Sequence, residues 1–192
     1  MSNFRNDLQE ANRQQKDPIW EALYREYFPN YIASITNPTD NQGQRLGTDR
    51  VIYLSNNKTV LIDEKVRKKD YGDILLETQS SIEHKTLGWI EKDLQCNYIA
   101  YLFQSSRTLY MLPWNELKRA WVSQWKNKYR DAIIAQNEGY RTECIPIPIQ
   151  EVKRVLGEGI ELRGSLYGFS GFSNHIYGTK TKIDFDLGLG AA

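Results

Sequence analysis

Four side chains that could bind a metal ion or stabilise developing charge lie close together in the sequence: Asp49, Asp63, Lys65 and Glu77. Two carboxylates that meet beside a lysine are costly to bury without compensation. A divalent cation relieves their repulsion, and Mg²⁺ binds one or two carboxylates together with water and phosphate oxygens. A metal held in this way polarises a phosphodiester and lowers the pKa of a bound water, while the lysine stabilises charge on phosphorus. These residue types suit phosphodiester hydrolysis if the fold brings them together.

A predicted β-hairpin carries the first three of these residues. Asp49 precedes the β-branched and aromatic run 51–54, a polar turn containing two asparagines follows, and a second run covers 59–66. Successive strand residues point to opposite faces, so Asp63 and Lys65 share one face of the second strand. In an antiparallel hairpin the start of the first strand lies opposite the end of the second. We therefore expect Asp49 beside Asp63.

A third predicted strand, 73–80, adds Glu77 and Gln79 on one of its faces. If the three strands pair as a meander, these two side chains reach the edge of the sheet where the acids and the lysine lie. Glu64 lies on the opposite face of its strand, so we expect it to have a structural role.

Asp49, followed at hairpin spacing by Asp63-x-Lys65, resembles the core motif of the PD-(D/E)xK nuclease superfamily, which has the restriction-endonuclease-like fold. The resemblance covers about residues 19–112, and Thr48 stands where the name of the motif has proline. It implies an α/β fold with an αβββαβ core, in which helices flank a central mixed sheet. It also implies a Mg²⁺ or Mn²⁺ cofactor, and hydrolysis of phosphodiester bonds in DNA, with RNA as the less favoured substrate.

The same resemblance extends to residues outside the motif. Glu77 and Gln79 correspond to a polar residue that some members use on the following strand, as a metal ligand or in contact with water. A helix before the sheet often presents an acid to the metal in this superfamily, and Glu21 is the candidate here, although a solvated helical glutamate is the simpler interpretation.

The charge distribution bears on a nucleic-acid partner. The chain of 192 residues has a formal net charge of +1, so no overall positive field attracts nucleic acid. Any such surface must be local, and the candidates are the cluster Arg67, Lys68 and Lys69 and the loop residues Gln44 and Arg45. A homodimer that cuts two strands stays an open alternative.

Two further interpretations remain open. A catalytically silent protein on the same scaffold could act as a protein-binding, nucleic-acid-binding or regulatory module, because a fold does not dictate a function. Alternatively, residues 63–65 are surface charge on an unrelated α+β domain. The near-neutral charge and a C-terminal segment rich in glycine and aromatic residues suit a binding module.

Length and composition predict a single core domain over residues 1–156, including an N-terminal helical arm, and a C-terminal extension over 157–192. Cys96 and Cys144 lie far apart and in no zinc-binding pattern, which favours a reducing compartment and argues against zinc. No apolar segment is long enough to span a membrane, so we expect a cytoplasmic protein without a membrane partner.

The remaining elements follow from periodicity and from turn residues. We expect helices over 18–28, 83–95, 113–129 and 150–156, a short helical stretch ending at 137–139, strands over 97–103 and 108–112, and an edge strand over 143–149. The alternating prolines of the last segment argue against a central strand.

Overall fold

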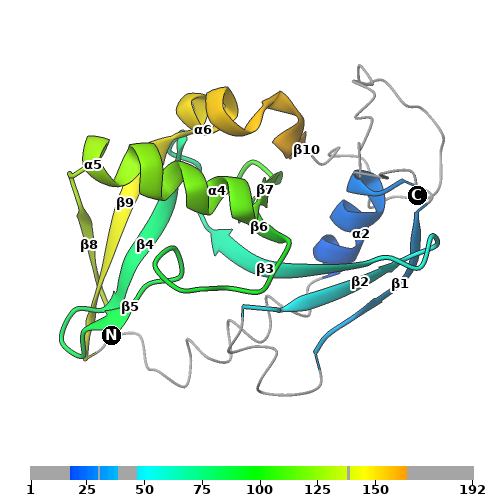
Figure 1. Ribbon diagram of the computed structural model, residues 1–192, viewed down its shortest axis with the longest axis horizontal. Helices are drawn as coiled ribbons and strands as arrows, with labels where there is room; N and C mark the ends of the chain where they lie inside the picture. Colours follow the sequence, from blue (N-terminus) through cyan, green and yellow to red (C-terminus); the bar gives the residue numbers. More distant parts are fainter. Residues whose placement is uncertain (1–17, 30, 39–46, 138, 164–192) are drawn as a thin grey trace.

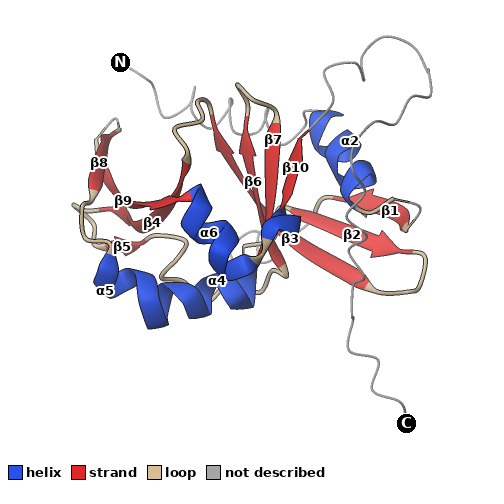
Figure 2. Ribbon diagram, turned by 90° about the horizontal axis from the view of Figure 1, so that it is seen from above, coloured by secondary structure: helices blue, strands red, loops and turns tan. Residues whose placement is uncertain are grey.

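Two β-sheets form the framework of the protein in the computed structural model, which describes residues 18–29, 31–38, 47–137 and 139–163 (Figure 1). The fold is mixed α/β, with a central mixed sheet and few helices. Figure 2 shows the two sheets side by side, with α4 and α6 lying against them. The predicted arm over 1–17 and residues 164–192 of the predicted extension lie outside the described residues.

The central sheet has six strands in the order β1-β2-β3-β6-β7-β10. Neighbouring strands run antiparallel except β3 and β6, which are parallel. The elements of this half are α2 (Pro18–Tyr27), β1 (Ile32–Thr36), β2 (Arg50–Leu54), β3 (Thr59–Arg67), β6 (Tyr98–Phe103), β7 (Thr108–Pro113) and β10 (Glu161–Arg163).

The second sheet has four antiparallel strands in the order β5-β4-β9-β8. Its strands are β4 (Asp73–Ser81), β5 (Thr86–Leu87), β8 (Ile133–Gln136) and β9 (Arg141–Pro148). The helices beside it are α4 (Trp114–Ala120), which continues through a π-helical turn (Trp121–Trp125) into α5 (Lys126–Lys128), and α6 (Ile149–Leu156), followed by a 3-10 turn (Glu158–Ile160).

The predicted hairpin is confirmed. Strands β2 and β3 pair antiparallel from Arg50 with Ile62 to Tyr53 with Thr59. Asn57 in the connecting turn has a φ of 61°, a left-handed conformation that asparagine tolerates better than most residues. The backbone N–H of Asp49 donates to the carbonyl oxygen of Ile62 at 2.8 Å, which extends the pairing by one residue and holds Asp49 against β3.

The prediction that the third strand completes a meander is wrong. Strand β4 leaves β3 through a turn in which Gly72 has a φ of +76°, and it pairs with β9 and β5 instead. The free edge of β3 is taken by β6, in register from Ile62 with Tyr98 to Arg67 with Phe103. The side chains of β6 are buried from Ile99 to Phe103, as expected for a strand covered on both faces.

The helix predicted over 83–95 is also wrong, because this segment forms turns, β5 and a loop. The cause lies at Gly88, which packs so tightly on β4 that an added Cβ would lie 2.1 Å from the carbonyl oxygen of Glu77. The N–H groups of Gly88 and Ile90 donate to the carbonyls of Thr78 and Glu77. The apolar spacing that predicted a helix comes from a loop in which Ile90 and Leu94 are buried.

Two corrections concern the second sheet. Residues 133–136 form β8, where a helical stretch was expected before residues 137–139. The expected edge strand, β9, lies between β4 and β8 over residues 141–144. Pro146 and Pro148 pair only with β4, so the prolines do occupy a part of the strand whose other side has no described partner strand.

The other predicted helices are confirmed, and their apolar faces form two cores. Helix α2 buries Trp20, Leu23 and Tyr24 against one face of the central sheet. The tryptophan stripe of the helix over 114–128 is buried in a second cluster together with residues of α6, β4, β6 and β9. In the described part of the chain no helix is both long and apolar enough to cross a membrane.

Candidate active site

Asp63 and Lys65 form an ion pair on one face of β3, as their alternation predicts. Lys65 Nζ lies 2.6 Å from Asp63 Oδ2, and the two side chains are 27% and 6% exposed. Asp63 Oδ2 is the one buried side-chain polar atom in the described ranges that accepts no hydrogen bond of regular geometry. Charge attraction therefore holds the pair while one carboxylate oxygen keeps unused capacity to bind a ligand.

Asp49 joins the pair from the turn before β2. Its Oδ2 accepts a hydrogen bond from the backbone N–H of Glu64 at 2.9 Å, so its side chain lies beside the strand that carries Asp63. Both the charge of Asp49 and a hydrogen bond with it raise the pKa of Asp63. Asp49, Asp63 and Lys65 thus lie together in the structure, as the hairpin predicts.

The protonation of this group follows from burial and from charge. Burial raises the pKa of Asp63 to about 7; Lys65 opposes that shift and Asp49 adds to it. Burial alone would lower the pKa of Lys65, but the charges of Asp63, Asp49 and Glu77 outweigh it and raise that pKa. Near neutral pH the lysine is a cation and Asp63 is close to its titration midpoint.

Glu77 approaches the same site from the second sheet. Its charge is among those that raise the pKa of Lys65. Burial raises the pKa of Glu77 itself, against the opposing effects of Lys65 and Lys92 and a backbone hydrogen bond from Trp89. Glu77 therefore lies near the lysine as expected, although β4 and β3 are not paired as expected.

Gln79 and Glu21 do not join this group in the described structure. Gln79 pairs with Glu143 and Leu87 beside a bulge in β4, and it has no described hydrogen bond or ion pair with the acids or the lysine. Glu21 accepts a hydrogen bond from Arg25 at 2.7 Å, in an exposed pair one helical turn apart. The simpler interpretation, a solvated helical glutamate, fits its position.

The residues predicted to contact nucleic acid have mixed outcomes. Gln44 and Arg45 lie outside the described residues. Arg67 is committed within the protein: its guanidinium forms an ion pair with Asp73 and lies 4.7 Å from the centroid of the Tyr71 ring. Lys68 and Lys69 are exposed at the end of β3.

A second polar group, which the sequence did not reveal as a unit, lies on the opposite face of β3. Glu64 Oε1 accepts hydrogen bonds from the Tyr24 hydroxyl at 2.8 Å and from Arg50 Nε at 2.9 Å, and Oε2 accepts one from Arg50 Nη2 at 3.2 Å. The network joins α2, β2 and β3 directly behind the candidate site. Two sequence features could have indicated this network. Alternation along the strand places Glu64 on the face opposite Asp63, and Arg50 lies on the neighbouring strand.

The donor set decides which metal ion the site fits. No group of three or more His, Cys, Asp or Glu side chains converges within the described residues, so a closed site made only of protein ligands is absent from them. Asp49 and Asp63 provide carboxylate oxygens, and one of these is buried without a regular hydrogen bond. This pattern fits Mg²⁺ or Mn²⁺, because Mg²⁺ keeps several waters and needs only one or two carboxylates.

The stability of the metal-free protein is expected to fall as the pH rises from about 4 to about 7, partly because of Asp63. Its pKa is about 7 in the folded protein against about 3.8 ordinarily, so over this range the folded state binds more protons than the unfolded state. The effect amounts to at most about 4 kcal/mol. Urea unfolding across this range measures it, and Asp63→Asn is expected to flatten the slope.

The control is Asp70→Asn, which changes an exposed carboxylate. Because Asp63→Asn also deprives Lys65 of its counter-charge, the readout is the pH slope rather than the stability at one pH. Equal slopes for Asp63→Asn and the wild type would contradict the assignment of a raised pKa to Asp63.

Comparison with known proteins leaves the family open. No family model matches the chain, and neither a curated protein nor a solved structure matches it.

Proposed function

We propose that the protein is a metal-dependent nuclease that hydrolyses phosphodiester bonds of DNA, or less favourably RNA, with a site like that of the PD-(D/E)xK superfamily. The observation that carries the proposal is the contact of 2.6 Å between Lys65 and Asp63, with Asp49 beside it. Two carboxylates and an ammonium group in one partly open site are what metal-dependent phosphodiester hydrolysis requires. The carboxylates can hold a metal cation, and the ammonium group can stabilise the negative charge that develops on the phosphate.

The order of elements supports the same proposal. Helix α2 is followed by three antiparallel strands, β1, β2 and β3, and the chain later returns as β6 parallel to β3. This order supports an αβββαβ core, with one departure. The connection from β3 to β6 contains β4, β5 and turns where that core has a helix.

The roles of the residues follow from their geometry. Asp49 and Asp63 would hold Mg²⁺, which when bound activates a water and polarises the phosphate. Lys65 would turn from Asp63 toward the phosphate and stabilise its negative charge. Asp63 and Asp49, with a smaller contribution from Glu77, raise the pKa of Lys65, so that the lysine stays protonated at neutral pH. Since Asp63 must lose its proton to bind a cation, metal affinity should increase with pH through about 7.

The test is cleavage of supercoiled plasmid and of single-stranded DNA, with and without Mg²⁺ or Mn²⁺. The wild type should cut only with metal, and Asp49→Asn should lose activity at least about 100-fold, as expected when an electrostatic catalytic contact is lost. Glu158→Gln is the matched control, because its side chain is 79% exposed and remote in sequence from the site. Equal rates for Asp49→Asn and the wild type would contradict the proposal.

One observation favours a second candidate, a catalytically silent binding module. Lys65 already pairs with Asp63 in the metal-free protein, so the site does not need a metal ion to balance the charge of Asp63. Calorimetric titration with Mn²⁺ separates the two candidates. Absence of binding at millimolar concentration would favour the module over the nuclease.

A further inference from the structure

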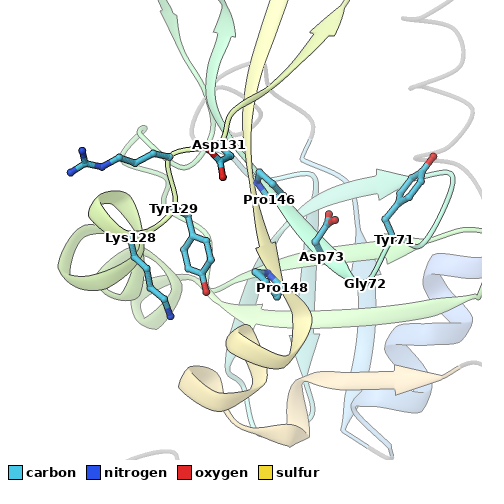
Figure 3. A pocket seen from close by; sticks show the side chains of 9 residues that line it. Tyr71, Gly72, Asp73, Lys128, Tyr129, Asp131, Pro146 and Pro148 are labelled. Carbon is cyan, nitrogen blue, oxygen red and sulfur yellow. The ribbon is translucent and has the colours of Figure 1, made fainter.

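A pocket of about 310 Å³ lies where the second sheet meets the loop after α5 (Figure 3). Tyr71 and Tyr129 stand on opposite sides of it, and Pro146 and Pro148 lie between them. The prolines belong to the part of β9 that pairs only with β4, so no described strand covers this side of the sheet. The lining therefore combines two tyrosines with two prolines.

Strand β3 links the pocket to the candidate active site through Arg67. Asp63, Lys65 and Arg67 are every second residue of β3 and therefore share one face of the strand. Arg67 forms an ion pair with Asp73, which lines the pocket. The four residue steps from 63 to 67 span about 13 Å of strand. A nucleic-acid strand whose phosphate lies at Lys65 would thus reach the pocket within a few nucleotides.

The charges around the pocket favour a neutral ligand group over a phosphate. Lys128 and Arg130 line it together with Asp73 and Asp131, so cations and carboxylates are balanced. Lys128 also pairs with Glu151 at 3.1 Å, and Arg130 Nε donates to the carbonyl of Asn127. Because Lys128 and Arg130 already interact with other protein groups, stacking on the tyrosine rings is the main interaction that the pocket can make with a ligand.

Tyr71 is suited to such stacking. Arg67 lies over its ring at 4.7 Å from the centroid, yet the residue remains 65% exposed. Stacking of bases on aromatic side chains beside cations is how proteins bind single-stranded nucleic acid without reading its sequence. Exposed Lys68 and Lys69 precede Tyr71 in the chain and can pair with the flanking phosphates.

We propose that this pocket binds an unpaired base of a single-stranded nucleic acid, a few nucleotides from the phosphate at Lys65, with Tyr71 and Tyr129 as the stacking residues. The proposal rests on the proposed nuclease function and specifies its substrate as a single strand or an unpaired end. A paired base cannot enter, because its faces are already covered by stacking within the duplex.

The test measures binding of a fluorescent oligothymidylate by anisotropy, in the full chain carrying Lys65→Ala so that no cleavage interferes. Adding Tyr71→Ala or Tyr129→Ala should weaken binding about 5- to 50-fold, within the range of one lost base stack. Phenylalanine at either position should restore most of the affinity, since it keeps the ring. The control is Tyr53→Ala, which removes another exposed tyrosine on β2, 44% exposed, and should have no effect.

Three outcomes would overturn the proposal: no binding of the oligonucleotide by the Lys65→Ala parent, alanine variants that bind as the parent does, or an equal loss for duplex DNA. Separate cleavage assays distinguish this failure from failure of the nuclease proposal. A wild type that cuts, with an unchanged KM in Tyr71→Ala, contradicts only the pocket. A wild type that binds through the tyrosines and never cuts contradicts only the nuclease.

Discussion

Replacing Lys65 by alanine is expected to reduce metal-dependent cleavage at least about 100-fold, the usual cost of removing one preorganised group that stabilises developing charge. Binding of the divalent cation is expected to persist or to become tighter. The reason is that Lys65 Nζ lies 2.6 Å from Asp63 Oδ2 and competes with a cation for that oxygen. The variant thus separates the catalytic contribution of the lysine from metal binding.

Cleavage rates at saturating Mg²⁺ and titration with Mn²⁺ measure the two effects on the same preparations. Lys126→Ala is the matched control, because it removes a cation that is 53% exposed and pairs with Glu91 rather than with Asp63. A Lys65→Ala protein that cuts at the wild-type rate would remove the lysine from the mechanism. One that no longer binds Mn²⁺ would make the lysine a structural support of the acids.

Replacing Arg50 by alanine is expected to lower the free energy of unfolding by about 3–5 kcal/mol, the usual cost of removing one partner from a buried ion pair. Arg50 donates twice to Glu64, whose side chain is 3% exposed, so the substitution leaves a buried carboxylate with only Tyr24 as a side-chain donor. Burial raises the pKa of Glu64 while Arg50 and Tyr24 oppose that shift. Without the arginine the pKa of this carboxyl should rise further.

Urea denaturation of three variants tests this expectation. Arg25→Ala removes the cation of an exposed pair with Glu21 and should cost less than about 1 kcal/mol. Tyr24→Phe removes one hydrogen bond to a charged group and should cost about 1.5–3 kcal/mol. If Arg50→Ala were no more destabilising than Arg25→Ala, the buried network would not be what joins α2 to the hairpin.

The sequence predicts the hairpin of the site well, because the information is local. Asn57 supports the turn, and alternation along β3 determines that Asp63 and Lys65 face one side and Glu64 the other. The position of Asp49 follows from the hairpin register alone. A short segment of chain therefore contains almost everything that brings the two acids and the lysine together.

The rest depends on contacts between distant segments. Whether β4 or β6 pairs with the open edge of β3 is decided by the buried run Ile99–Phe103, which competes for that edge from more than thirty positions away. The tight approach of Gly88 to Glu77 likewise overrides a helix-like apolar spacing. Residues 133–136 carry exposed isoleucines and become a strand only because β9 lies beside them.

The two thiols of the chain, Cys96 and Cys144, are buried and free, and charged residues of the site influence their pKa values. Burial raises the pKa of each to about 12; the charge of Asp63 adds to the shift at Cys96, and that of Glu77 adds to it at Cys144. Both sulfurs therefore stay protonated and make poor nucleophiles. Burial, with a smaller contribution from the nearby carboxylates, therefore protects these cysteines from alkylation and oxidation.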